Sequence, residues 1–147
     1  MEEVHEDLSR QRARDVSEML QQIVEPQAYG CSVMRYIQSH RQLFVSASKP
    51  LPQMGTTHDL YLWCEAVVFF EGPMSWRGLG FRLASFEERR ALVAGGWAPI
   101  GDEDIDAFAA YHVLLILERP GYRVRICAGN CGFEERLPPE LLPTLAP

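Results

Sequence analysis

An unusually apolar stretch, LYLWCEAVVFF, runs from residue 60 to residue 70. As a single strand it would place apolar side chains on both faces, because successive side chains of a strand alternate between two sides. Leu62 and Val68 would lie on one side, and Trp63 and Phe69 on the other. The second face then needs cover from the protein's own helices and loops, from a ligand, from another copy of the chain or from a partner.

The N-terminal region predicts a helix over residues 3–25. Its second half carries one apolar stripe with helical spacing, formed by Val16, Met19, Leu20, Ile23 and Val24. Residues 1–14 carry few apolar side chains, so we expect that part of the helix to project from the body. Pro26 ends the helix, because proline lacks the backbone N–H and clashes with the preceding turn.

Beyond residue 30 the apolar period changes to two, which is typical of strands. Residues 31–38 and 42–48 are predicted to form a hairpin joined near residues 39–40, with Leu43, Val45 and Ala47 on the buried face of the second strand. Residues 49–57 are predicted to form a loop because they contain two prolines. The apolar stretch at 60–70 follows, and Gly72-Pro73 ends it.

The central region predicts a strand followed by two helices. Leu79, Phe81 and Leu83 alternate in the strand, and Ser85 with Glu88 forms a capping-box pattern that starts a helix. We expect this helix to end at Gly95-Gly96, where glycine can adopt a left-handed conformation.

A shorter helix is predicted over residues 102–111. Asp102 is the expected N-cap, and Ile105, Phe108 and Ala109 form the expected buried face.

The C-terminal region predicts a second hairpin, with strands at 113–119 and 122–128 around Pro120-Gly121. Its register would place Glu118 opposite Arg123. One face would combine apolar residues of both strands, namely Val113, Leu115, Leu117, Tyr122, Val124 and Ile126. The proline-rich residues 138–147 are expected to be extended or to form at most one helical turn.

Together these elements predict a single α+β domain over residues 1–147. We expect a mainly antiparallel sheet of about five to six strands, with the N-terminal helix and the central helix pair packed on one face. A chain of 147 residues is long enough to bury one ordinary core.

Charge narrows the choice of partners. The net charge of −6 opposes binding to nucleic acid, which requires clustered lysine and arginine.

The sequence shows no targeting or membrane segment. The chain begins MEEVHED, without the basic and apolar regions of a secretion signal, and no stretch approaches the roughly 18 apolar residues of a membrane span. The sequence therefore predicts a cytoplasmic protein that binds neither nucleic acid nor membrane.

The motifs that would indicate a cofactor or a metal are incomplete. Asp102-Glu-Asp-Ile-Asp106 begins like a calcium loop but lacks its central glycine and closing glutamate, and Gly78-Leu-Gly80 lacks the spacing of a phosphate loop. Cys127 and Cys131 form the one close cysteine pair, and whether they join in a disulfide stays open. We expect free thiols, no metal and no cofactor.

Two hypotheses from different classes remain. The first is a non-enzymatic protein-binding module of the inhibitor, immunity or chaperone type, with an acidic surface suited to a basic partner protein. Its expected anchors are Trp76 and Trp97, predicted to lie in loops, together with Arg77. Self-association into a homodimer is compatible with this hypothesis and with the next.

The alternative is a small-molecule-binding protein or minor enzyme. Its pocket would be aromatic, lined by Trp63, Phe69 and Phe81, with Glu65 as the polar group. No serine, cysteine, histidine and carboxylate in the chain show a spacing that favours nucleophilic catalysis. No catalytic residue is therefore predicted, and the sequence favours the first hypothesis.

Overall fold

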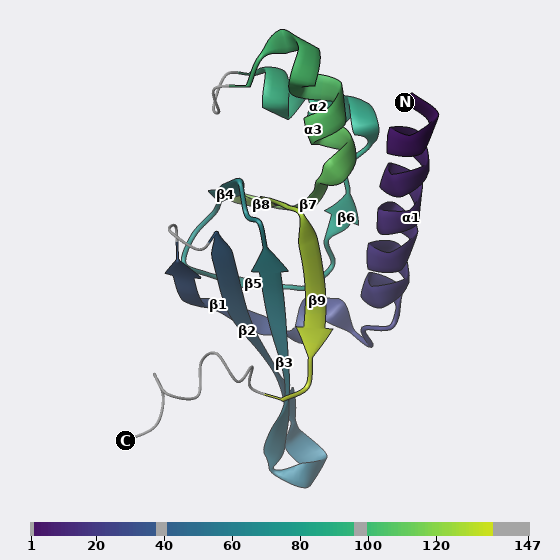
Figure 1. Cartoon of the computed structure of the whole chain (residues 1–147). Helices are drawn as coiled ribbons and strands as arrows, with labels where there is room; N and C mark the ends of the chain where they lie inside the picture. Colours follow the sequence, from purple (N-terminus) through teal and green to yellow (C-terminus); the bar gives the residue numbers. More distant parts are fainter. Residues whose placement is uncertain (1, 38–40, 96–99, 137–147) are drawn as a thin grey trace.

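The structure is a computed structural model that describes residues 2–37, 41–95 and 100–136. Within these residues the chain forms three α-helices and nine strands (Figure 1). The helices are α1 Glu2–Gln21, α2 Phe86–Ala94 and α3 Ile105–Tyr111. The strands are β1 Gly30–Ile37, β2 Gln42–Leu51, β3 Thr56–Glu65, β4 Phe69–Glu71, β5 Ser75–Arg77, β6 Arg82–Leu83, β7 Val113–Arg119, β8 Tyr122–Ala128 and β9 Asn130–Glu134.

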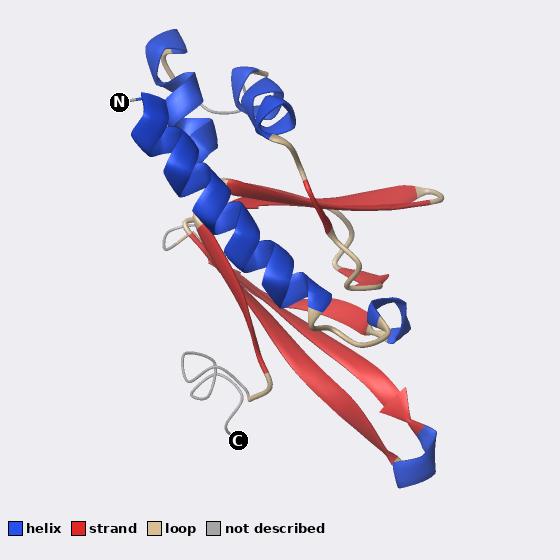
Figure 2. Ribbon diagram, turned by 90° about the vertical axis from the view of Figure 1, so that its right-hand side faces the viewer, coloured by secondary structure: helices blue, strands red, loops and turns tan. Residues whose placement is uncertain are grey.

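The strands form two antiparallel sheets. The five-stranded sheet has the order β5-β1-β2-β3-β9, and the four-stranded sheet has the order β4-β8-β7-β6. Their inner faces share one apolar core, which includes Leu62 from β3 and Leu115 from β7. Helix α1 runs past both sheets (Figure 2) and packs Val16 and Leu20 against this core. The α+β class is confirmed, but the predicted single sheet is wrong, because the strands divide between two.

The predicted strand over 60–70 is also wrong, because the chain crosses from one sheet to the other within it. β3 ends at Glu65, and Ala66 adopts a left-handed conformation with φ of 51°. β4 then begins at Phe69 in the other sheet. A run of apolar residues does not reveal such a break, since strands on both sides of it are partly buried.

The predicted loop over 49–57 is mostly strand. β2 and β3 pair from Leu43 opposite Cys64 to Leu51 opposite Thr56, which includes Pro50 opposite Thr57, and a 3-10 turn at Pro52–Met54 joins them. Proline is tolerated here because the pairing of β1 with β2 ends at Ser48. Beyond that point one side of β2 is an open edge, where a missing N–H costs little.

The first central helix, α2, starts where the sequence predicts, but its end and the start of α3 differ from the prediction. The capping box of Ser85 and Glu88 is confirmed. Gly95 is right-handed, with φ of −69°, and Gly96 lies outside the described residues. Asp102 does not cap a helix, because Asp102–Asp104 forms a 3-10 turn and α3 begins at Ile105.

Other elements also begin or end at residues that differ from the prediction. Helix α1 ends at Gln21, before Pro26, and its Arg12 donates hydrogen bonds to the backbone oxygens of Tyr111 and Gly129. The turn of α1 that contains Arg12 is thus tied to the body of the protein, although it belongs to the part that was expected to project.

Leu79 and Phe81 are buried, but they do not lie in the predicted strand, because the strand in this region, β6, consists only of Arg82 and Leu83. The C-terminal hairpin has the predicted register, with Glu118 opposite Arg123.

Candidate functional site

Helix α2 is fixed over the outer face of the four-stranded sheet by its first turn. The Ser85 hydroxyl accepts from the backbone N–H of Glu88 at 3.1 Å, and the Glu88 carboxylate accepts from the N–H of Ser85 at 3.1 Å. Arg89 is only 4 % exposed. Its guanidinium donates to the backbone oxygens of Ala109 at 2.9 Å and Ala84 at 3.1 Å, so it ties α2 to α3 and to the end of β6. Burial lowers the pKa of this guanidinium from its usual value.

The outer face of this sheet has an apolar row and a charged row. In the apolar row, Phe69, Cys127, Leu114 and Ala84 lie side by side across the strands, with Leu92 of α2 packed on them. In the next row, Glu71, Arg125, Ile116 and Arg82 lie side by side. Helix α2 covers the first row, whereas the charged side chains of the second row reach solvent and its Ile116 is buried. This arrangement follows from strand periodicity together with the position of α2.

A groove of about 530 Å³ lies where these two rows meet the second half of α2. We call it the outer-face groove, and it is lined by Phe69, Glu71, Glu88, Ala91, Leu92, Gly95, Leu114, Ile116 and Arg125. Its apolar lining comes from both the sheet and the helix. Its charged lining comes from ion pairs at its two sides.

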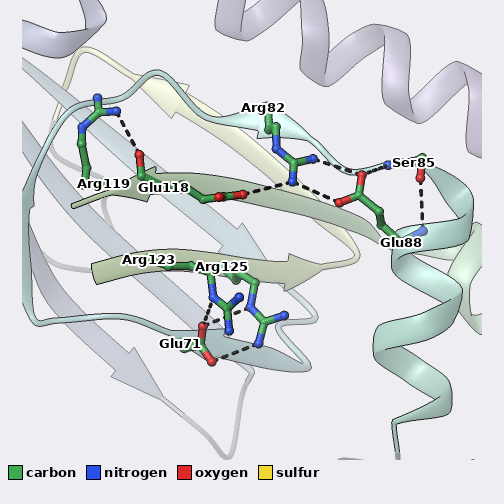
Figure 3. A network of polar contacts seen from close by, with 8 residues as sticks. All are labelled: Glu71, Arg82, Ser85, Glu88, Glu118, Arg119, Arg123 and Arg125. Atoms are coloured by element: carbon green, nitrogen blue, oxygen red, sulfur yellow. Dashed lines mark hydrogen bonds and ion pairs between the residues drawn. The ribbon is translucent and has the colours of Figure 1, made fainter. Parts of the chain in front are cut away.

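One side of the groove is held by Glu71 (Figure 3). Its carboxylate accepts from Arg125 at 3.0 and 3.1 Å and from Arg123 at 2.7 Å. These arginine hydrogen bonds lower the pKa of Glu71, so it is charged at neutral pH. The Arg125 guanidinium also lies 5.0 Å from the centre of the Phe69 ring. The ion pair and the apolar floor are therefore in direct contact.

Arg82 organises the other side. It donates to both carboxylate oxygens of Glu88, at 3.0 and 3.1 Å, and to Glu118 at 3.2 Å (Figure 3). Its bonds, and that from the Ser85 N–H, lower the pKa of Glu88. Across both sides the network contains three arginines and three glutamates, so its formal charge is balanced. Carboxylates held charged in this way suit recognition better than proton transfer.

The structure corrects the predicted position of Trp76. It lies in β5 rather than in a loop and is only 7 % exposed. Its indole N–H donates to the Gly78 oxygen at 3.0 Å, and its ring packs edge-on against Phe81. Neighbouring glycine and proline suggested a loop, but the pairing of β5 with β1 is a long-range contact that they do not reveal. Trp97 lies outside the described residues.

The residues of the predicted aromatic pocket are distributed over three places. Trp63 and Glu65 alternate with the buried Leu62 and Cys64, so they lie on the outer face of the five-stranded sheet. Phe69 lies in the outer-face groove. Phe81 belongs to the core between the sheets. These four side chains do not line one pocket.

Arg77 lies in another groove, next to the turn between β2 and β3. This groove has a volume of about 600 Å³ and is lined by Glu25, Ala28, Lys49, Pro50, Leu51, Pro52, Gln53, Met54 and Arg77. Met54 is 74 % exposed. We call this second groove the hairpin groove. Like the outer-face groove, it is an open surface with apolar lining.

A polar contact near the hairpin groove was not predicted. The Tyr29 hydroxyl lies 2.7 Å from Nδ1 of His58, whose Nε2 is 3.7 Å from Glu135. Burial and nearby carboxylates raise the pKa of Tyr29, so its hydroxyl is neutral at physiological pH. This contact ties the start of β1 to β3 and to the residues after β9.

The sequence carried a partial signal for the charged network. Arg123 and Arg125 are two residues apart on a strand, and Glu118 was predicted to lie opposite Arg123. Neither Glu71 nor Arg82 could be added, since their strands reach the network through long-range pairing.

Within the described residues, no group of three or more histidine, cysteine or acidic side chains is arranged to hold a metal ion. No helix among these residues is both long and apolar enough to cross a membrane. The chain matches no known protein-family model, no curated protein and no solved structure.

Proposed function

We propose that the protein is a non-enzymatic protein-binding module that receives an apolar side chain of a partner protein in the outer-face groove. The observation that carries this proposal is the apolar floor of Phe69, Leu92 and Ile116 between two sets of ion pairs. Protein interfaces have the same anatomy, with an apolar centre and a polar rim. The groove is open, as a surface that receives a segment of another protein must be.

The charges of the groove favour a protein over other classes of ligand. A polyanion would meet the carboxylates of Glu71, Glu88 and Glu118 as well as the arginines. A protein segment carries both signs of charge and apolar side chains, and so it complements a charge-balanced rim. The net charge of −6 favours a partner that is basic as a whole, since opposite charges accelerate the encounter. An inhibitor, immunity-type protein or chaperone would act in this way.

The test places one positive charge in the groove. Leu92→Lys puts an ammonium group on the apolar floor while keeping a residue that favours helices. Met74→Lys makes the same change at a side chain that is 64 % exposed and lies outside the groove lining. Both variants and the unmodified protein are immobilised and exposed to a lysate of the cells from which the gene derives. Bound proteins are identified by mass spectrometry, and the affinity of the purified partner is then measured by calorimetry.

We expect the partner to bind the unmodified protein and Met74→Lys equally, and Leu92→Lys at least about tenfold more weakly. Thermal unfolding of each variant shows whether the fold is intact. Equal binding to all three proteins contradicts the proposed surface. A small molecule retained in native mass spectrometry and lost in Leu92→Lys would instead support the alternative, a small-molecule-binding protein.

A further inference from the structure

Two cysteines that are far apart in the sequence face each other across neighbouring strands. Cys64 of β3 is paired directly with Cys131 of β9. The Cys131 thiol is near enough to Cys64 to raise its pKa. Both residues point into the core, with exposed fractions of 1 % and 6 %.

The backbone geometry of this pair permits a disulfide. Directly opposed residues in an antiparallel sheet have Cα atoms about 4.5 or 5.5 Å apart, and disulfides span about 4.4 to 6.8 Å. Cys127, which is close to Cys131 in the sequence, lies on β8 in the other sheet, where it is paired with Phe69 and Leu114. The strand pairing therefore aligns Cys131 with Cys64 and not with Cys127.

We propose that Cys64 and Cys131 form a modification site that closes to a disulfide by exchange with a low-molecular-weight disulfide such as oxidised glutathione. One cysteine thiolate attacks the reagent, forms a mixed disulfide and releases one thiol. The second cysteine thiolate then attacks the protein sulfur of the mixed disulfide and releases the second thiol. Both cysteines lose a proton, the protein loses two electrons, and the reagent gains them as two thiols.

Access to the pair is through β9. This strand is at the edge of the five-stranded sheet and has β3 as its one neighbour there. Local opening of an edge strand costs less than global unfolding and would expose both sulfurs together. The neighbouring Cys131 thiol and burial raise the pKa of Cys64 well above its ordinary value, so little thiolate is present at neutral pH. The reaction therefore requires local opening of β9, and it accelerates with pH as the thiolate fraction of the exposed cysteines rises.

Strand pairing, and not thiol acidity, makes the other two thiols poorer sites. Burial raises the pKa of Cys31 and of Cys127 to about 12. Neither residue is opposed by a cysteine in its sheet, since Cys31 faces Ala47 and Trp76. Cys31→Ala and Cys127→Ala are therefore matched controls.

The test incubates the full chain with oxidised glutathione at pH 8.5 and follows its intact mass and its non-reduced peptide map. We expect a loss of about 2 Da and one crosslinked peptide that joins Cys64 to Cys131. The crosslink should also form in Cys31→Ala and Cys127→Ala, and should be absent from Cys64→Ala and Cys131→Ala. The closed ring should raise the thermal midpoint by roughly 5 °C or more, reversed by dithiothreitol.

Several results would overturn the proposal. A crosslink between Cys127 and Cys131 would show that these two cysteines, and not Cys64 and Cys131, form the disulfide. A stable glutathione adduct on one cysteine would show that the second thiol cannot reach the mixed disulfide. No change of mass under conditions in which the urea-unfolded chain is oxidised shows that the folded pair is inert. The map of the unmodified protein decides among these outcomes even where a cysteine variant does not fold.

Discussion

Arg89 and Arg90 are neighbours on α2 with opposite surroundings. Arg89 is buried and satisfies the backbone oxygens of Ala84 and Ala109, whereas Arg90 is exposed and pairs with Asp106 at 2.6 Å. Removing the Arg89 side chain takes away the donor that these two backbone carbonyl groups share. We expect Arg89→Ala to lower the free energy of unfolding by about 2–4 kcal/mol. Arg90→Ala should cost less than about 1 kcal/mol, as exposed ion pairs do.

Urea denaturation of the two variants measures this difference. Equal losses would mean that Arg89 does not hold α2 in place, and the geometry of the outer-face groove would then need another explanation.

Gly132 of β9 is held against Trp63 of β3. A Cβ atom at position 132 would overlap the indole ring, far inside any allowed contact. Gly132→Ala should therefore displace Trp63 and cost about 1–3 kcal/mol of unfolding free energy, with a change in tryptophan fluorescence. Gly80→Ala is the control, because a methyl group at position 80 would meet no atom within 4 Å and the φ of Gly80 is ordinary. A neutral Gly132→Ala variant would show that Trp63 does not cover this strand.

At the scale of elements, the C-terminal end of α3 should make stability depend on pH. His112 follows α3, its Nδ1 donates to the Phe108 oxygen at 2.7 Å, and its ring stacks on Phe108. Burial, chiefly, lowers the pKa of His112 below its ordinary 6.5, and Arg12, Arg41 and Arg89 lower it further. The folded state therefore favours the neutral imidazole.

The sign of the effect follows. Below about pH 6.5 the unfolded chain takes up a proton that the folded chain resists, so this residue's contribution is complete above pH 6.5 and is lost as the pH falls toward the folded pKa. Denaturation at several pH values between 7.5 and 5 should show a smaller loss of stability in His112→Gln than in the unmodified protein. Identical pH profiles would contradict the assignment.

The elements that the sequence predicts well are those defined by local interactions. Residues 113–128 combine a Pro-Gly turn with regular alternation on both sides, so the strands and their register follow from neighbouring residues. The capping box at Ser85 is equally local. The break at Ala66 is different, because the Glu65 and Ala66 oxygens accept from Gly129, a contact between segments distant in sequence. The pattern of apolar residues near residue 66 does not indicate this long-range contact.

At the scale of the whole molecule, the same distinction explains the candidate site. Sequence alternation places Arg123 and Arg125 on the outer face of their hairpin, but the groove also needs β4, β6 and α2. These elements meet the hairpin only through tertiary packing. Trp76 gives the converse case, in which a residue with the composition of an interface anchor is covered by the protein itself.

The outer-face groove and the hairpin groove are both open and both have apolar lining, but the ion pairs beside the outer-face groove favour it as the one that binds a partner protein. Hydrogen–deuterium exchange of the protein, alone and with the captured partner, distinguishes the two grooves. We predict slower exchange in the bound state over residues 86–95 and 113–125, with residues 49–58 unchanged. Protection over residues 49–58 with residues 86–95 unchanged would contradict the claim and assign binding to the hairpin groove.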